Sequence, residues 1–313
     1  MIKKLRRTKI EPQPVVPPKR KLSVVTGGAG FIGATLVDRL LERGDQVVVI
    51  DNESANTHDE VYWNPNAINI QGDITDFTLL KNACTNADCI YHMAADISIQ
   101  YSIENPIPSY TNNVIGTLNV LEVARILNIK KVVFSSTAAI YGSTSEPCVE
   151  TDRPDPLNPY SVSKLAGENL MKMYNDLYGM QTVSLRYFNV YGPRQAHKGQ
   201  YAPVIGIFQK QKFEGKPLTI IGDGNQTRDF IHVADVAHAN VMVSESDVVG
   251  VFNVGSGVEY SVNQIAMLTN NPHGTTTIPS REGEARRSLS DNTKLKDIGW
   301  QPRIGLEAWI AKQ

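Results

Sequence analysis

A glycine-rich stretch at residues 24–33, Val-Val-Thr-Gly-Gly-Ala-Gly-Phe-Ile-Gly, constrains the fold of this chain more than any other feature. We expect a buried strand before it and an amphipathic helix after it. Gly27 permits a tight turn, Gly30 lets the backbone approach a pyrophosphate, and Gly33 lets helix and strand pack together. The start of the helix adds free N–H groups and a positive dipole end, which suit an anion. The stretch therefore predicts a dinucleotide-binding turn.

A glycine pattern alone is weak evidence, and the next strand supplies its context. An apolar run from Gln46 to Ile50 ends in Asp51, 24 residues beyond Gly27. An acidic residue at this place accepts hydrogen bonds from the adenosine ribose hydroxyls and repels a 2′-phosphate. We therefore predict that the cofactor is NAD rather than NADP.

Strand and helix patterns alternate over the first half of the chain, which predicts a parallel sheet with helices on both faces. Such sheets bind ligands at the carboxyl ends of their strands, where Asp51, Asp73, Ala94 and Ser135 are all expected. The small pair Ala94 and Ala95 suits either a cofactor or simple helix–sheet packing. Further strands are predicted at 67–70, 89–93 and 131–135, and helices at 77–85 and 110–127.

The alternation weakens after Arg194, where a helix at 204–214 and a short strand at 218–221 suggest a smaller lobe. The predicted fold class is α/β, a Rossmann-type doubly wound parallel sheet with a smaller C-terminal substrate-binding lobe. The predicted domains are a basic Pro-rich tail (1–21), a cofactor domain (22–188 plus about 229–255) and a substrate lobe (about 189–228 plus 256–313).

Composition excludes several classes of protein. The 313 residues carry a net charge of −1 and an apolar fraction of 41%, with no sign of a nucleic-acid or membrane surface. No apolar run is long enough for a membrane span. Cys84, Cys89 and Cys148 lack metal-ligand spacing, so we expect reduced packing residues in the cytoplasm and no metal. We interpret the basic tail as an extended segment rather than an electrostatic anchor.

Tyr160 and Lys164 lie four residues apart in a predicted helix and therefore share one face. A phenol with a pKa of about 10 is a poor base at neutral pH. A nearby ammonium group, together with a cationic nicotinamide ring, favours the phenolate. A hydroxyl at the end of the neighbouring strand, in Ser135-Ser136-Thr137, can hydrogen-bond the same substrate oxygen. This set predicts proton removal from an alcohol coupled to hydride transfer.

Four segments together resemble a known family: Thr-Gly-Gly-Ala-Gly-Phe-Ile-Gly (26–33), Ser-Ser-Thr-Ala-Ala-Ile-Tyr-Gly (135–142), the Tyr160/Lys164 pair and Arg-Tyr-Phe-Asn-Val-Tyr-Gly-Pro-Arg (186–194). They are similar to the extended short-chain dehydrogenase/reductases, and most of all to nucleotide-sugar 4-epimerases of the UDP-galactose 4-epimerase group. The resemblance implies that a tightly held NAD takes hydride from C4 of a UDP-sugar, leaving a 4-keto sugar that turns over and receives the hydride on its other face.

The resemblance, which covers about residues 22 to 310, also implies roles for single residues. Tyr160 would be the base, Lys164 would hold the ribose and tune Tyr160, and Thr137 would bond the 4-oxygen. The expected cofactor-binding residues are Gly27, Gly30, Phe31, Ile32, Gly33, Asp51, Asn52, Asp73, Ile74, Ala94, Ala95, Asn113, Ser135, Tyr160, Lys164 and Tyr187. The expected substrate-binding residues are Thr137, Tyr160, Asn189, Thr219, Ile221, Arg228, Arg281 and Ser288.

Within the substrate set, Asn189, Arg228 and Arg281 would bind the diphosphate, since arginine forks match phosphate oxygens. Main-chain groups around Thr219 and Ile221 would pair with the uracil. In related enzymes the position of Ser288 lines the sugar pocket.

Other reactions of related enzymes need groups that this chain lacks. Sugar 4,6-dehydratases place Asp-Glu after the catalytic Thr, where this chain has Ala138 and Ala139. Decarboxylases of UDP-glucuronate usually have a Glu in that segment, and 3,5-epimerases need a Cys near Ile140. The remaining alternatives are a UDP-glucuronate 4-epimerase, an NAD-dependent nucleotide-sugar dehydrogenase or reductase, and, as the least favoured, a non-catalytic NAD-binding protein.

The choice of sugar and the oligomeric state are finer expectations. A small residue at Ser288 leaves space for an acetamido group, which favours UDP-GlcNAc/UDP-GalNAc as well as UDP-Glc/UDP-Gal. Arg286 and Arg287 could instead meet a uronic acid. By the same resemblance we expect a homodimer through a four-helix bundle, built from helices at about 109–127 and 160–178. Four apolar residues of these helices could serve either the bundle or the sheet: Leu118, Leu121, Leu170 and Met173.

Overall fold

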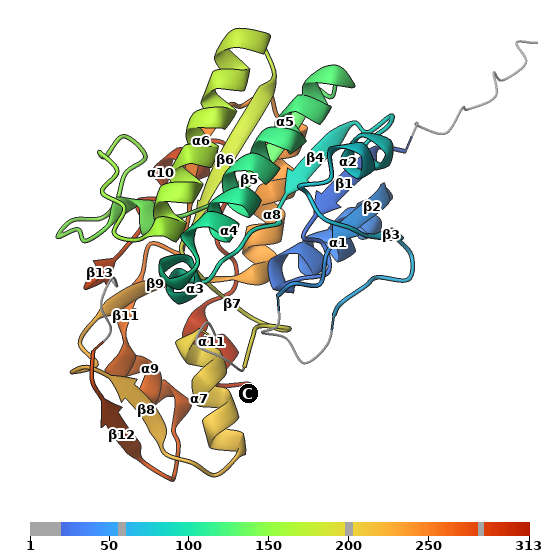
Figure 1. The fold of residues 1–313 in the computed structure, drawn as a ribbon. Helices are drawn as coiled ribbons and strands as arrows, with labels where there is room; N and C mark the ends of the chain where they lie inside the picture. Colours follow the sequence, from blue (N-terminus) through green and yellow to red (C-terminus); the bar gives the residue numbers. More distant parts are fainter. Residues whose placement is uncertain (1–19, 56–60, 198–202, 281–284) are drawn as a thin grey trace, which may run out of the picture.

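The computed structural model describes residues 20–55, 61–197, 203–280 and 285–313. Its largest feature is a parallel sheet with the strand order β10-β6-β5-β4-β1-β2-β3 (Figure 1). The order reverses between β1 and β4, as in a doubly wound sheet. The predicted Rossmann-type α/β fold is confirmed. The strands of this sheet are β1 (Leu22–Thr26), β2 (Gln46–Asp51), β3 (Ile68–Gln71), β4 (Cys89–His92), β5 (Lys131–Thr137), β6 (Gln181–Tyr187) and β10 (Gly250–Val254).

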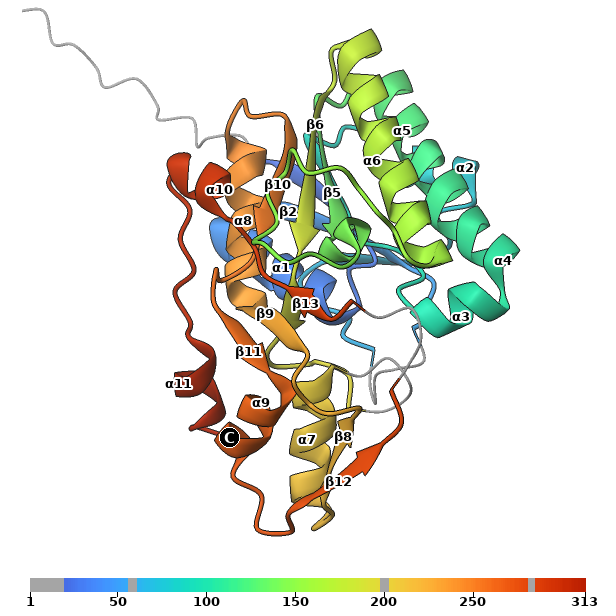
Figure 2. The same ribbon diagram turned by 90° about the vertical axis from the view of Figure 1, so that its left-hand side faces the viewer.

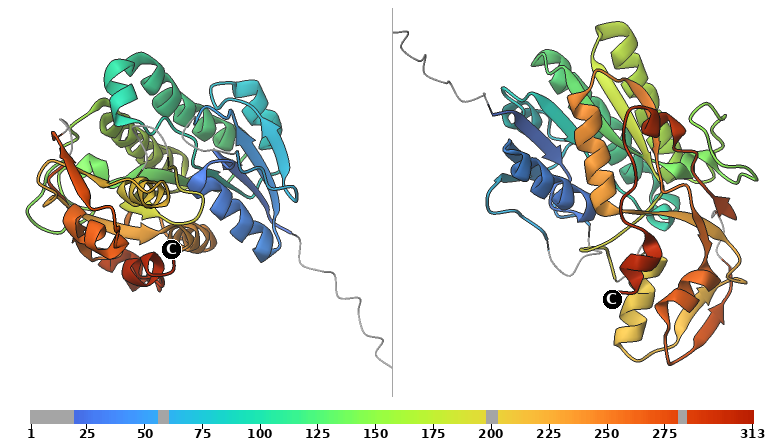
Figure 3. Two further views of the ribbon diagram at one scale, coloured as in Figure 1. Left: turned by 90° about the horizontal axis from the view of Figure 1, so that it is seen from below. Right: turned by 180° about the vertical axis from the view of Figure 1, so that it is seen from behind.

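Helices cover both faces of the sheet (Figure 2). One face carries α1 (Phe31–Arg43) and α8 (Val233–Glu245), and the other carries α2 (Phe77–Ala83), α5 (Gly116–Ile126) and α6 (Pro159–Tyr178). Seen from behind, α8 crosses the sheet beside α1 (Figure 3). Because both faces are covered, the inner strands β1, β2 and β4 are buried along most of their length, whereas the edge strand β3 is mostly exposed.

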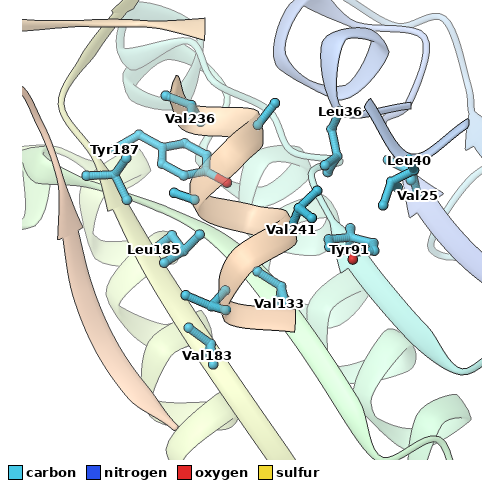
Figure 4. Close-up of a cluster of buried hydrophobic side chains, with 14 of the residues drawn as sticks. Val25, Leu36, Leu40, Tyr91, Val133, Val183, Leu185, Tyr187, Val236 and Val241 are labelled. Atoms are coloured by element: carbon cyan, nitrogen blue, oxygen red, sulfur yellow. The ribbon is translucent and has the colours of Figure 1, made fainter. Parts of the chain in front are cut away.

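Two buried clusters hold these layers together. Successive residues of β1 point to opposite faces, so Val24 lies in the cluster under α5 and α6 and Val25 in the cluster under α1 and α8. Figure 4 shows Val236 and Val241 of α8 against side chains of the central strands, including Leu185.

The helix predicted over 110–127 begins earlier and is not uniform, so its predicted start is wrong. The segment consists of α4 (Pro106–Tyr110), the π-helical turn η1 (Thr111–Ile115) and α5. Pro106 occupies the first turn of α4, where its missing N–H costs nothing. The preceding helix α3 (Ile99–Glu104) was not predicted. The other predicted elements of this domain end within two residues of their observed bounds.

A smaller lobe forms below the sheet in Figure 1 and has an apolar core of its own. Its helix α7 and strand β8 were predicted, whereas β12 and α11 were not. The strand β12, Thr-Thr-Thr-Ile, is exposed along its length and shows no apolar alternation. The elements of the lobe are α7 (Val204–Phe213), β8 (Leu218–Ile221), α9 (Val262–Thr269), β12 (Thr275–Ile278) and α11 (Leu306–Ile310).

The strand β9 (Thr227–His232) lies between the two cores. Its Phe230 packs into the core of the lobe and its neighbour Ile231 into the α1/α8 cluster. It pairs with β7, β11 and β13 rather than with the large sheet. The predicted domain boundaries stay a prediction. The remaining elements are η2 (Ala138–Tyr141), β7 (Asn189–Tyr191), β11 (Glu259–Ser261), β13 (Arg287–Ser288) and α10 (Thr293–Asp297).

The three cysteines are free and buried. Burial raises the pKa of the Cys84 and Cys89 thiols to about 12, which suits packing rather than reactivity. The described residues contain no helix long and apolar enough to cross a membrane, and no group of three or more side chains that could hold a metal ion. Of the predicted tail, residues 1–19 lie outside the described ranges.

Buried His92 links the glycine turn to α5. Its Nδ1 lies 2.8 Å from Thr26 Oγ1 and its Nε2 lies 3.0 Å from Thr117 Oγ1. Because the Thr117 hydroxyl donates to the carbonyl of Asn113, it accepts from His92, which identifies the neutral Nε2–H form of the ring. Burial, aided by the charge of Lys164, lowers the pKa of His92 to about 3.

The stability of the fold should therefore depend on His92 in acid. The unfolded chain binds a proton at this residue below a pH of about 6.5, whereas the folded chain does not until near pH 3. As the pH falls from 6.5, the wild type should lose stability relative to His92→Gln by up to about 1.4 kcal/mol per pH unit. Urea unfolding between pH 7 and 4.5 measures this difference. The exposed His273→Gln is the control, and parallel curves for wild type and His92→Gln would contradict the expectation.

Candidate active site

The glycine turn is as tight as the sequence predicts. Gly27 has a φ of +68° after β1, and a Cβ there would meet the Ala94 nitrogen at 2.6 Å. A Cβ on Gly33 would lie 2.0 Å from the Gly27 carbonyl oxygen. Gly30 has more room, since its Cβ would lie 3.5 Å from the same oxygen. The turn thus opens the start of α1, with Phe31 and Ile32 in its first turn, toward a ligand.

Asp51 lies beside this turn at the end of β2. Its carboxylate accepts hydrogen bonds from the N–H groups of Ala29 and Glu53 at 3.0 and 2.8 Å. The neighbouring Asn52 donates to Asp73 at 2.7 Å. Burial alone would raise the pKa of Asp73, but hydrogen bonds from Thr75 and Asn52 lower it below its usual value. The glycine turn and the acidic side chains beside it fit the pyrophosphate and adenosine parts of NAD.

Several other expected cofactor residues make contacts within the chain. The Ile74 side chain is buried against Gly116. Asn113 is buried and holds both backbone groups of Asp96 as well as the Ser163 hydroxyl. The buried ring of Tyr187 packs under α8, and its hydroxyl pairs with Asn240. Ala94 donates its N–H to Thr26 Oγ1, and Ala95 follows it on the same half-buried segment.

Tyr160 and Thr137 come together as predicted. Thr137 ends β5, and its hydroxyl accepts the N–H of Ala139 at 3.1 Å. Tyr160 lies in the first turn of α6, which Asn158 caps. Burial raises the pKa of Tyr160, whereas a hydrogen bond between its hydroxyl and that of Thr137 lowers it. The phenol therefore needs further positive charge nearby to act as a base.

Lys164 lies one helical turn further along α6 and is almost fully buried. Its Nζ donates to the carbonyl of Ser135 at 2.8 Å and lies 4.8 Å from the centre of the Phe134 ring. Burial lowers the pKa of this ammonium group to about 7, although the carboxylate of Glu168 acts in the opposite direction. The amine of Lys164 is thus held at the end of β5 with a pKa close to neutral pH.

A buried ion pair behind Lys164 escaped the sequence analysis. Arg186 on β6 and Glu168 on α6 form two hydrogen bonds of 2.7 and 2.9 Å, and Ser136 donates to the same carboxylate. Glu168 lies four residues after Lys164, so the spacing could have indicated that it shares the helix face. The pair holds α6 against the strands that end at the site.

Strand β9 assembles the expected substrate side from three parts of the chain. Asn189 of β7 is in register with Phe230, and Ser288 of β13 is in register with Arg228. The Arg228 guanidinium donates to the carbonyl of Thr227 at 2.8 Å. Arg281 lies outside the described residues.

Both arginines next to Ser288 have carboxylate partners. Arg286 donates to Asp223 at 2.6 Å on the surface. Arg287 forms a fork on Glu259, with two hydrogen bonds of 2.9 Å. A uronic acid carboxylate would therefore compete with acids of the chain itself.

Comparison with known proteins shows to which family this chain belongs. The family described as NAD dependent epimerase/dehydratase matches residues 23–255. A UDP-glucose 4-epimerase of Mycolicibacterium smegmatis is 38% identical over 302 residues, which are 93% of this chain and 96% of that protein.

Two solved structures are similar along nearly the whole chain. The UDP-glucose 4-epimerase of Thermus thermophilus in complex with NAD matches with a TM-score of 0.86 and 35% identity, over 92% of this chain and 96% of that one. The UDP-N-acetylglucosamine 4-epimerase of Methanobrevibacter ruminantium M1, in complex with UDP-N-acetylmuramic acid, matches with a TM-score of 0.88 and 35% identity, over 93% and 96%.

These matches confirm the family and the cofactor expected from the sequence. Each of the two structures matches more than nine-tenths of this chain, so the likeness extends beyond the large sheet to the smaller lobe. This chain is a member of the NAD dependent epimerase/dehydratase family, and its cofactor is NAD.

Proposed function

We propose that this protein epimerises a UDP-sugar at C4. The observation that carries the proposal is the hydroxyl pair of Tyr160 and Thr137, with buried Lys164 one helical turn away. The two residues after Thr137 are alanines, so the chain keeps the groups for oxidising an alcohol and lacks a further acid or base at that point. This chemistry matches 4-epimerisation better than dehydration or decarboxylation.

Each chemical step has a residue of the chain for its proton. Tyr160 takes the proton of the C4 hydroxyl, and Thr137 hydrogen-bonds the same oxygen. Bound NAD supplies the acceptor, and on return the donor, of the C4 hydride. The 4-keto sugar turns between the two transfers, and Tyr160 returns the proton to its oxygen. Proton and hydride are both restored, so the net reaction is an isomerisation without consumption of NAD.

Ser288 supports a pocket with room for an N-acetyl sugar. It is a half-buried, small residue, and its strand places it beside Arg228. The carboxylate partners of Arg286 and Arg287 favour an uncharged sugar over a uronic acid, because a sugar carboxylate would have to displace Asp223 or Glu259. We therefore favour UDP-GlcNAc/UDP-GalNAc together with UDP-Glc/UDP-Gal over UDP-glucuronate.

The first experiment incubates the purified full chain separately with UDP-GlcNAc, UDP-Glc and UDP-glucuronate, and follows the anomeric and H4 signals by proton NMR. We expect the C4 epimers of UDP-GlcNAc and UDP-Glc without net NADH. Tyr160→Phe should lower kcat by about 10²- to 10⁴-fold, since the base is lost, while bound NAD is retained.

Tyr178→Phe, on the same helix and exposed, is the matched control and should epimerise normally. Net NADH with a keto or acid product would identify a dehydrogenase instead. If the C4 epimer of UDP-glucuronate is the main product, the protein is a UDP-glucuronate 4-epimerase instead. If none of the three sugars is epimerised, the proposal is refuted.

The size of residue 288 should decide which sugars fit. Ser288→Tyr should lower kcat/KM for UDP-GlcNAc by at least about tenfold, because a tyrosine ring there fills the space of the acetamido group. It should change kcat/KM for UDP-Glc by less than about threefold. Initial rates with the two sugars measure both values, so UDP-Glc is the internal control. Equal losses for the two sugars would exclude Ser288 from the pocket wall.

We also propose that two copies of the chain pair through α5 and α6. Leu121 is fully buried in the sheet cluster, and Leu118 and Leu170 pack against it, so these three serve the sheet. Met173 and Leu177 of α6 are 37% and 67% exposed. Further exposed apolar residues of these helices and η1 are Ile115, Ile126 and Val162. Such a face is typical of a helical interface.

Light scattering should therefore give about twice the mass of one chain. Changing Met173 and Leu177 together to Asp should give the single-chain mass, because charges would be buried between the helices. Phe213→Asp on α7, where the side chain is 93% exposed, is the control and should leave the mass doubled. A single-chain mass for the wild type would contradict the proposal.

A further inference from the structure

Arg194 has a backbone conformation that few residues other than glycine adopt. It follows β7 by three residues and has a φ of +69°, in the left-handed region where a long side chain is strained. Such strain persists only where the surrounding contacts hold the residue in place. The contacts of Arg194 should therefore show what the strained position is for.

The Arg194 side chain reaches two segments beside the cofactor site. Its Nη1 donates to Asp38 of α1 at 2.6 Å, and its guanidinium carbon lies 5.5 Å from the centre of the Tyr62 ring. The second oxygen of Asp38 accepts the side-chain amide of Asn64 at 2.7 Å. Arg194 thus connects the segment after β7 with α1 and with residues 61–64, which we call the strap.

The main chain of the strap is bonded to the glycine turn. The N–H of Tyr62 donates to the carbonyl of Ala29 at 3.0 Å, and the N–H of the same Ala29 donates to Asp51 at 3.0 Å. Ala29 lies within the turn, between Gly28 and Gly30. Both of its backbone groups are therefore held from outside the turn, one by the strap and one by Asp51.

A second contact joins the strap to the end of β2. Trp63 Nε1 donates to Glu53 at 2.7 Å, and the Glu53 N–H donates to Asp51 at 2.8 Å. These bonds close a ring of contacts that runs through Ala29, Asp51, Glu53, Trp63 and Tyr62. Because Asp51 and the glycine turn fit the adenosine and pyrophosphate parts of NAD, this ring borders the adenosine end of the cofactor site.

We propose that Arg194 is a positioning residue for the cofactor, which holds the strap against the glycine turn and thereby slows the release of NAD. The ion pair with Asp38 is about a third exposed, so it adds little to the stability of the whole fold. Opening a short segment costs far less free energy than unfolding, so a contact of this strength can control it. The inference concerns bound NAD and goes beyond the proposed reaction, since it holds for any sugar.

The test measures the exchange of NAD on the purified full chain. The protein is loaded with radiolabelled NAD and diluted into excess unlabelled NAD, and the label that stays on the protein is followed with time. Arg194→Asn tolerates the left-handed backbone, but its side chain is too short to reach Asp38 or Tyr62. It should release the label about fivefold faster, because an ion pair and a cation–π contact are lost together.

Arg39→Gln is the matched control. It removes the ion pair of an α1 arginine with Glu42 and leaves Asp38 in place, so the exchange rate should not change. Asp38→Asn decides the result if Arg194→Asn does not fold. It should also speed the exchange, but by less, because the contact of Arg194 with Tyr62 remains.

Tyr62→Leu separates positioning through the strap from a general loosening of the fold. It should speed the exchange when Arg194 is present and add little when Arg194→Asn is already made, because the two changes break one contact. Urea unfolding of each variant measures the global stability, which should stay close to that of the wild type.

Several results would overturn the inference. These are complete exchange by the wild type on mixing, an unchanged rate in both Arg194→Asn and Asp38→Asn, an equal acceleration in Arg39→Gln, and full additivity of the Arg194 and Tyr62 changes. No sugar is present in the assay. A failure here therefore leaves the proposed 4-epimerisation standing, and a protein that epimerises none of the sugars can still show the expected exchange.

Discussion

The close contact of Gly27 with Ala94 and Gly33 is the constraint on which the site depends. A single Cβ at Gly33 would lie 2.0 Å from a backbone oxygen, and one at Gly27 would lie 2.6 Å from a backbone nitrogen. Because no side chain intervenes, α1 packs directly on the turn after β1, and the segment after β4 packs on the other side. The N–H groups of α1 therefore open at the same edge of the sheet at which β5 delivers Thr137.

Helix α6, which carries Tyr160 and Lys164, has a second anchor, which works through charge rather than through close packing. Glu168 and Arg186 pair in the interior, and Ser136 donates to the same carboxylate, so α6 is fixed to both β5 and β6. A buried pair of this kind adds little net stability, but losing one partner leaves an unpaired charge in the core. Its value here is positional, because Lys164 lies one turn and Tyr160 two turns before Glu168 on the same helix.

The cofactor side could be predicted from the sequence because its information is local. The glycine spacing, Asp51 after a strand, and Tyr160 with Lys164 each depend on residues a few positions apart or on one regular element. Three features could not be predicted in this way: the start of the α4 helix at Pro106, the strand β12, and the Glu168–Arg186 ion pair. An exposed run of threonines carries no periodic signal, and the partner of a buried charge lies on another element.

The proposed substrate side depends on the register between distant segments of the chain, and β9 provides that register. Asn189, Arg228 and Ser288 come from three segments of the chain, and pairing with one strand aligns them. Asp229 of that strand is buried and accepts hydrogen bonds from Ser256, Gly257 and Ser290, which fixes the segments on either side. Under the proposed function, a residue on this side, such as Ser288, can therefore change while the glycine turn and its sheet stay intact.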